Sequence, residues 1–244
     1  MKTIMNSFQI LAWDSEFFEI TIARVLPERL TTVQLERTIA GMKEKKVRLA
    51  YWLSNPNDRE SQLAALACQG YLADRKVTFV ADIEQVQEPA GRLKWFVEEY
   101  TDTYTNNDLE NLAIQAGAYS RFKLDPRIPG RKFEDLYKLW IRKSVNREIA
   151  DTVLVARHAG NVVGMVTVGE KNGRSDIGLI SVDTCMRGKS IGYSLVSAAQ
   201  KWGRKKGYKF TQVVTQEENI VACKLYEGCG YRIDKNEYLY HFWI

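Results

Sequence analysis

The stretch DIGLISVDTCMRGKSIGYSLVSAAQKWGRKK, residues 176–206, decides the fold of this chain. Its first part predicts a strand, because the apolar, β-prone residues in 177–182 show no helical spacing. Its last part predicts a helix, in which apolar side chains from Leu195 to Trp202 form one stripe before a basic end. The stretch therefore reads as a strand, a glycine-bearing loop and a helix start.

The loop between this strand and helix has the parts of an anion-binding site. The first turn of a helix leaves N–H groups unpaired and carries about half a positive charge from the macrodipole. Gly188 and Gly192 would let the backbone approach a phosphate closely. The loop is a candidate phosphate site, and a basic turn without a ligand is the alternative.

The spacing of the loop residues separates several phosphate-binding patterns. A P-loop needs a leading glycine where Asp183 stands, and the dinucleotide fingerprint G-x-G-x-x-G is absent. The sequence Arg187-Gly-Lys-Ser-Ile-Gly192 instead resembles the R/Q-x-x-G-x-G/A pyrophosphate loop of the GNAT N-acetyltransferase superfamily, which binds acetyl-coenzyme A. It departs from that pattern at Ser190, where the family has glycine, and the serine could tighten or re-aim the loop.

A second motif follows one strand later, at residues 219–231. A strand is predicted over 210–214, then a helix over 220–227 that Gly228 and Gly230 end. Residues 219–231 resemble the second conserved block of the same superfamily, N-x-x-A-x-x-x-Y-x-x-x-G-F/Y. Two motifs in the right order are far more specific than either alone, so the chain is identified as a member of this superfamily.

Composition limits the other functions that this chain could have. The 244 residues are 45% hydrophobic and 27% charged, and the net charge of +5 is not concentrated in one run. No aromatic and basic residues interleave as in RNA-binding proteins, and no stretch is long enough to span a bilayer. Four cysteines without CxxC pairs and two scattered histidines indicate reduced thiols and no metal site. We expect a cytoplasmic protein without nucleic-acid partner or membrane insertion.

The periodicity predicts the other elements in chain order. Strands are expected over 8–11, 20–26, 47–53, 76–83, 93–100, 152–157, 161–170 and 175–182, with a final hairpin over 231–244. Helices are expected over 32–46, 59–68, 109–118 and 133–144, with a loop over 119–126. The segment Trp13–Phe18 reads as an aromatic turn, for domain packing or for base stacking.

These elements predict two domains. Residues 84–91, with Pro89, read as a linker, which gives a smaller N-terminal α/β domain over 1–88 and a GNAT domain over 89–244. The segments 69–75 and 229–235 are alike, which suggests two halves of related topology, the first without a phosphate loop, or convergence on one turn. The fold class is α/β (α+β), with a mixed, mostly antiparallel sheet in the GNAT fold and an N-terminal domain resembling a partial GNAT half.

The resemblance can be narrowed to the dTDP-fucosamine acetyltransferases, through residues 13–18, 119–122, 176–180 and 219–226. It implies direct transfer of acetyl from acetyl-CoA to a primary amine, the 4-amino group of a dTDP-linked amino-dideoxy sugar. Another amine (a protein N-terminus, a polyamine, an antibiotic) or a non-catalytic acyl-CoA-binding module is the alternative. A homodimer stays open.

The same resemblance implies a set of site residues. A backbone N–H near Val182 would polarise the thioester carbonyl. The implied cofactor-binding residues are Ile180, Ser181, Val182, Arg187, Gly188, Lys189, Ser190, Ile191, Gly192 and Asn219. Asn219 would position the cofactor or the helix that follows it.

Catalytic and substrate roles carry their own alternatives. Tyr226 is the expected general acid, with core packing as the alternative, and Glu170 the expected base, with a simple exposed carboxylate as the alternative. Tyr119, Ser120 and Arg121 would bind the substrate, or form a solvated loop.

Overall fold

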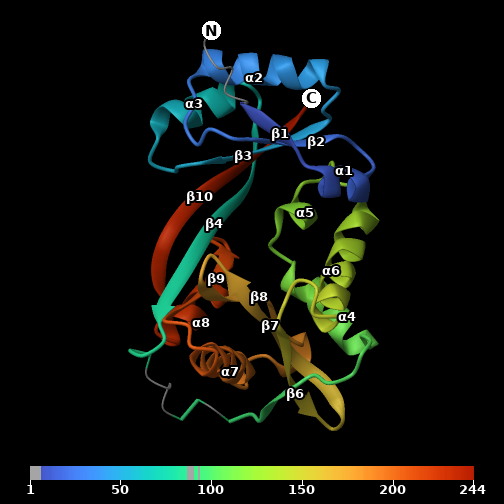
Figure 1. Cartoon of the computed structure of the whole chain (residues 1–244), viewed down its shortest axis with the longest axis vertical. Helices are drawn as coiled ribbons and strands as arrows, with labels where there is room; N and C mark the ends of the chain where they lie inside the picture. Colours follow the sequence, from blue (N-terminus) through green and yellow to red (C-terminus); the bar gives the residue numbers. More distant parts are fainter. Residues whose placement is uncertain (1–6, 87–90, 93) are drawn as a thin grey trace. The chain divides into compact units, whose positions relative to one another are not determined.

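The computed structural model describes residues 7–86, 91–92 and 94–244, and the chain forms two compact units (Figure 1). Unit 1 comprises Met1–Lys76 and Asn236–Ile244, and unit 2 comprises Val77–Lys235. Two long strands, β4 (Tyr71–Asp82) and β10 (Arg232–Trp243), contribute residues to both units. The predicted boundary at 88/89 adjoins residues 87–90, outside the described residues, and stays a prediction.

Unit 1 contains a mixed sheet with helices from the first part of the chain. Its elements before β4 are β1 (Phe8–Ile10), α1 (Ala12–Phe18), β2 (Ile22–Val25), α2 (Thr32–Glu44), β3 (Leu49–Ser54) and α3 (Arg59–Ala67). Strand β2 lies antiparallel to β1 and parallel to β3. The other side of β3 pairs antiparallel with β10, with Tyr238 opposite Ser54 and Trp243 opposite Leu49. The end of the chain thus completes the first unit.

Two predictions about unit 1 elements were wrong. Trp13–Phe18 is helical within α1, and its aromatic rings at positions 13 and 17 stack with centroids 5.4 Å apart, as a spacing of four residues on a helix allows. The final segment is the single twelve-residue strand β10 rather than a hairpin. Its Asn236 lacks the following glycine that makes a tight hairpin turn, so the strand continues to pair with β3.

Unit 2 carries a mixed and mostly antiparallel sheet, as predicted. Its strands follow the order β4-β9-β8-β7-β6-β5, and β8 with β9 is a parallel pair. Its elements after β4 are β5 (Val97–Glu99), α4 (Asn107–Ala116), α5 (Arg121–Leu124), α6 (Gly130–Val145), β6 (Thr152–His158), β7 (Asn161–Lys171), β8 (Arg174–Val182), the 3₁₀ turn η1 (Thr184–Met186), α7 (Ile191–Lys205), β9 (Phe210–Gln216) and α8 (Ile220–Gly228). The loop predicted over 119–126 contains the short helix α5.

Helix α7 covers one face of the unit 2 sheet. Its Leu195 and Ala199 belong to one buried cluster with Val166, Ile177 and Val213 of the strands. Helix α4 packs against β7 and β8, and α6 packs against α4 (Figure 1). Helix α4 and the segment after it therefore lie on the face of the sheet opposite α7.

The two halves of the chain repeat one order of elements. The series β2-α2-β3-α3-β4 matches β8-α7-β9-α8-β10, each with a parallel pair of strands around a helix and each ending in a twelve-residue strand. This agrees with the topology predicted from the likeness of residues 69–75 and 229–235.

Candidate functional site

Strands β8 and β9 separate at the middle of unit 2. Their register covers only Ser175–Ile177 opposite Thr211–Val213, although β8 runs on to Val182 and β9 to Gln216. On its other side, β8 stays paired with β7 through Ser181 and Val182. The β9-facing edge of residues 178–182 is thus left without a strand partner among the described residues.

The backbone of β8 aims polar groups at this free edge. The register with β7 shifts between Val166 and Val168, and the Leu179 N–H donates to Thr167 Oγ1 at 2.8 Å. The Asp183 N–H donates to the Val163 carbonyl of β7 at 2.9 Å. Successive residues in a strand point their N–H groups to opposite sides. Since the Asp183 N–H points to β7, the N–H of the preceding residue, Val182, points to the free edge. That edge can pair with an extended amide-bearing ligand.

The loop after β8 is held in a turn that leads directly into α7. The Asp183 carboxylate accepts from the Cys185 N–H at 2.8 Å, and the Arg187 Nε donates to the Val182 carbonyl at 3.1 Å. Gly188 and Ser190 adopt left-handed conformations, with φ of 77° and 66°. Glycine adopts that region freely, whereas the side chain of Ser190 makes it unfavourable there.

The start of α7 offers unpaired amides. Ser190 occupies the N-cap position, but its side chain makes no capping hydrogen bond. The N–H groups of Ile191, Gly192 and Tyr193 have no acceptor within the described part of the chain, because they open the helix. With the helix dipole and the exposed basic side chains of Arg187 and Lys189, this turn suits a diphosphate.

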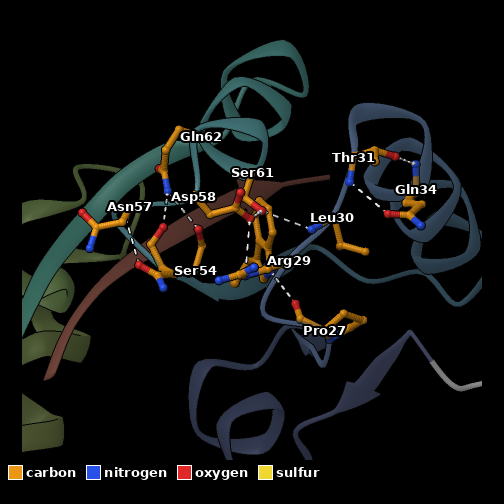
Figure 2. Close-up of polar contacts among 12 residues, drawn as sticks. Pro27, Arg29, Leu30, Thr31, Gln34, Ser54, Asn57, Asp58, Ser61 and Gln62 are labelled. Atoms are coloured by element: carbon orange, nitrogen blue, oxygen red, sulfur yellow. Dashed lines mark hydrogen bonds and ion pairs between the residues drawn. The ribbon is translucent and has the colours of Figure 1, made fainter.

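Unit 1 has no such turn at the matching position before α2. Thr31 Oγ1 accepts from the Gln34 N–H at 3.3 Å, and Gln34 Oε1 accepts from the Thr31 N–H at 2.9 Å (Figure 2). The preceding Leu30 N–H donates to Ser61 Oγ at 3.1 Å, and that hydroxyl donates to the Asp58 carboxylate at 2.7 Å (Figure 2). These side chains use the amides that a phosphate would need, and they add a negative charge nearby.

Helix α8 packs against the start of α7, which brings Tyr226 near the loop. A Cβ on Gly192 would lie 3.1 Å from the Leu225 side chain, and one on Gly228 would lie 2.7 Å from the Tyr193 hydroxyl. These glycines therefore allow the close approach of the two helices. Tyr226 and Ile191 belong to the same buried cluster, so the structure brings the predicted acid and the predicted phosphate loop together.

Tyr226 itself is 2% exposed. Its ring lies 5.7 Å from that of Phe79 and 6.0 Å from that of Tyr231, between centroids. Burial, with a smaller effect of Tyr231, raises the pKa of the Tyr226 phenol well above its usual value, so the phenol keeps its proton at neutral pH. Its hydroxyl makes no hydrogen bond to another residue in the part of the chain described here. Packing therefore fixes the ring.

Asn219 occupies the N-cap of α8. Its Oδ1 accepts from the Ala222 N–H at 3.3 Å, so it positions the helix that carries Tyr226, one of its two predicted roles. A contact between Asn219 and a cofactor stays a prediction.

Glu170 is not brought to this site. It lies opposite Ser175, whose hydroxyl faces α7, since a Cβ on Gly203 would lie 2.9 Å from it. Residues paired across two strands share a face, so Glu170 points to the α7 face of the sheet and not to the α4 face. Its Oε1 accepts from the Gly173 N–H at 2.6 Å and so closes the turn between β7 and β8. The geometry supports the simple exposed carboxylate rather than the base.

The predicted substrate residues follow α4, whose end lies near the loop. Gln115 Oε1 of α4 accepts from Arg187 Nη2 at 3.4 Å. Tyr119 is 40% exposed, Ser120 is buried and the Arg121 guanidinium lies 4.1 Å from the Phe122 ring centroid. The Ser120 hydroxyl finds no hydrogen-bond partner among the residues described. The three residues are thus of different character, because Tyr119 is exposed, Arg121 is half-buried and Ser120 is buried.

The sequence-based prediction missed Asp176. This residue lies near the start of β8, in the short stretch that pairs with β9. Gln212 Nε2 of β9 donates to its carboxylate at 2.8 Å. Burial raises the pKa of the Asp176 carboxyl, although the hydrogen bond from Gln212 opposes the shift. Because Ile177 faces the α7 cluster, the alternation of a strand turns Asp176 to the α4 side. A lone aspartate in an apolar strand was the available signal.

Comparison with known proteins agrees with this geometry. Residues 107–231, just over half of the chain, match the acetyltransferase (GNAT) family. This chain therefore belongs to the GNAT acetyltransferase family. Members of this family use acetyl-CoA as the donor.

Individual relatives are more distant. Spore coat polysaccharide biosynthesis protein SpsD of Bacillus subtilis (strain 168) is 26% identical over 132 residues, which are 54% of this chain and 45% of that protein. The chain spans less than half the length of the first curated relatives that it matches.

Two solved structures share the fold. A functionally unknown conserved protein from Staphylococcus epidermidis ATCC 12228 aligns with a TM-score of 0.66 and 15% identity, over 99% of this chain and 93% of that one. A tandem GNAT protein from the clavulanic acid biosynthesis pathway aligns with a TM-score of 0.56 and 13% identity, over 90% of this chain and 74% of that one.

Within the described residues, none of the helices has the length and apolarity to cross a membrane.

Proposed function

We propose that this chain transfers the acetyl group of acetyl-CoA to a primary amine, and that the amine is the 4-amino group of a dTDP-linked amino-dideoxy sugar. The observation that carries the transfer is the free edge of β8, which ends at the uncapped start of α7 beside the helix of Tyr226. The sugar is supported by the sequence resemblance and by the relative named for polysaccharide biosynthesis.

The residues fit a CoA thioester along one line. The amides at 190–193, with Arg187 and Lys189, would hold the diphosphate. The free edge of residues 180–182 would pair with the amide groups of the pantetheine arm, and the Val182 N–H would donate to the thioester oxygen, where negative charge develops. Acetyl-CoA supplies the activated carbonyl and a thiolate leaving group. Asn219, as the N-cap of α8, would hold that helix in position beside the bound thioester.

Tyr226 would protonate the leaving thiolate. Its elevated pKa keeps the phenol protonated in the resting enzyme, and its hydroxyl is not committed to another residue in the described chain. A general acid must hold its proton before the reaction and then donate it to the leaving group. The amine attacks directly, so the chain supplies no nucleophile of its own.

Asp176 would accept the proton that the amine must lose through intervening water, because six strand residues, about 20 Å, separate it from the Val182 amide. Its partly buried carboxyl lies one residue before the end of the β8–β9 pairing, on the α4 side of the sheet, and its raised pKa favours proton uptake. The Glu170 carboxylate accepts a hydrogen bond within the β7–β8 turn, and we do not assign it this role. Tyr119 and Arg121 would contact the sugar or its phosphates, and Ser120 would support their loop.

The function is tested by release of free CoA thiol over a panel of amines. We expect turnover with dTDP-linked 4-amino sugars and little with polyamines, aminoglycoside-type or streptothricin-type antibiotics, or peptide N-termini. Turnover on one of those other amines would support the acetyltransferase activity and contradict the proposed sugar substrate. Acetyl-CoA binding without thiol release on every amine, together with an insensitive Tyr226→Phe, would indicate a non-catalytic acyl-CoA-binding module.

The chain should bind one acetyl-CoA, not two. The start of α7 is uncapped, whereas the amides before α2 are taken by the Thr31–Gln34 capping box and by Ser61. Isothermal titration calorimetry should give a stoichiometry near one. A hundredfold excess of acetyl-CoA over Kd should add about 2.7 kcal/mol to the free energy of unfolding and so raise Tm. Two equivalents, or no Tm shift at that excess, would contradict this expectation.

Asp176→Asn should lower kcat/KM by about a hundredfold near neutral pH, at the lower end of the range for general acid–base catalysis. A carboxyl acts as a base only above its pKa, and burial raises that pKa. The wild-type rate should therefore fall as pH decreases through a value above that of an ordinary aspartate, and Asp176→Asn should lose this limb. Asparagine keeps an oxygen for the Gln212 donor.

The pH profile is measured in parallel for Asp176→Glu and Glu170→Gln. Glutamate at position 176 should retain an acidic limb, because it keeps a carboxylate. If Glu170→Gln removes the limb and Asp176→Asn leaves it in place, the base is Glu170, as the sequence alone suggested.

A further inference from the structure

One side chain outside the sequence motifs holds the phosphate loop. Trp95, just before β5, donates its indole Nε1–H to the Lys189 carbonyl at 2.8 Å, and its backbone N–H donates to Ser194 Oγ of α7 at 3.3 Å. The Trp95 ring also lies edge-on to His158, 5.8 Å between centroids, and packs against the α7 cluster. The tryptophan thus contacts both the loop and the helix that follows it.

The Lys189 carbonyl belongs to the same peptide unit as the Ser190 N–H. In a trans peptide these two groups point in opposite directions. A hydrogen bond that fixes the carbonyl toward Trp95 therefore fixes the amide on the other side of the peptide plane. That amide precedes the unpaired N–H groups of the first turn of α7.

This peptide carries conformational strain that the loop itself does not relieve. Ser190 has φ of 66°, where the GNAT pattern has a glycine, and its side chain makes no capping bond. A left-handed conformation is unfavourable for an L-residue other than glycine. An indole N–H is a suitable restraint because tryptophan donates but cannot accept, so it selects the carbonyl face.

We propose that Trp95 is a positioning residue for the donor. It orients the Lys189–Ser190 peptide so that the Ser190 amide meets the diphosphate of acetyl-CoA, and it compensates for serine at a glycine position. This inference rests on the proposed function of the loop. The segment has a second attachment to α7, where the Arg92 guanidinium hydrogen-bonds to the Tyr193 hydroxyl and lies 4.6 Å from its ring centroid.

The test replaces Trp95 by phenylalanine, which keeps an aromatic ring and removes the N–H. The Lys189 carbonyl lies on an exposed residue and can bond to water, so the ligand-free Tm should change little. Calorimetry with acetyl-CoA should show Kd raised about threefold to tenfold, the value of one hydrogen bond. Trp202→Phe is the matched control, since Trp202 stacks on Tyr208 near the other end of α7, and its Kd should stay at the wild-type value.

A second background separates positioning from general packing. Ser190→Gly removes the strain, so Trp95→Phe should weaken acetyl-CoA binding less in that background than in the wild type. Equal losses in both backgrounds, or an unchanged Kd in Trp95→Phe, would overturn the inference while leaving the proposed function in place. If the wild-type chain itself fails to bind acetyl-CoA, the proposed function falls first.

Discussion

Replacing Tyr226 by phenylalanine should lower kcat by about a hundredfold to ten-thousandfold and leave the affinity for acetyl-CoA nearly unchanged. The substitution removes only the phenol oxygen, and that oxygen makes no hydrogen bond in the described chain. The ring contacts with Phe79 and Tyr231 can persist, so the fold should be kept. Thiol release at saturating donor and amine measures kcat, and calorimetry measures Kd.

Tyr231→Phe is the matched control. Tyr231 is a second buried tyrosine on the same segment, but its hydroxyl lies 3.1 Å from Thr211 Oγ1. Phenylalanine there should cost about 0.5–1.5 kcal/mol of stability, the net value of one hydrogen bond, and leave kcat near the wild-type value. Wild-type turnover in Tyr226→Phe would remove the tyrosine as the acid and favour core packing as its role.

Deleting residues 236–244 should unfold unit 1. This segment supplies most of β10, the strand that pairs with β3, and its Leu239, Tyr240 and Phe242 side chains are buried. Fully burying one such side chain is worth about 1.5–3 kcal/mol, so three of them approach the whole stability of a typical domain. Hydrogen exchange should show that the amides of β3 lose their protection.

The control for this deletion removes only Ile244. That residue makes a single backbone hydrogen bond, from its N–H to the Arg48 carbonyl, and the rest of β10 stays paired. Its deletion should leave β3 protected. Slow exchange in β3 after loss of all nine residues would show that unit 1 does not depend on the end of the chain.

The local elements of the site could be predicted from the sequence. The strand before the loop, the helix after it and the helix of Tyr226 each follow from apolar spacing and glycine positions within about fifteen residues. The uncapped helix start could not be predicted in this way, because serine is a favoured N-cap residue and only the left-handed conformation of Ser190 leaves the helix start uncapped. The helix at Trp13–Phe18 was missed because seven residues are too few for a helical period to stand out.

The proposed base was less predictable. Glu170 and Asp176 are six residues apart on one hairpin, and nothing in their spacing tells which of them faces the α4 side. The answer depends on the bulge between Val166 and Val168 and on where β8 leaves β9. Trp95 escaped notice for the same reason, since its partner Lys189 is 94 residues away.

By itself, the sequence determined the order of strands and helices and the two motifs that make this chain a GNAT acetyltransferase, because capping, turn chemistry and apolar period act between near neighbours. Only the tertiary structure decided that β8 parts from β9 after Ile177, that residues 236–244 complete the first unit, and that Asp176 is partly buried while Glu170 is exposed. Strand pairing is set by contacts between residues far apart in the chain, and one residue of register exchanges the faces of every side chain that follows.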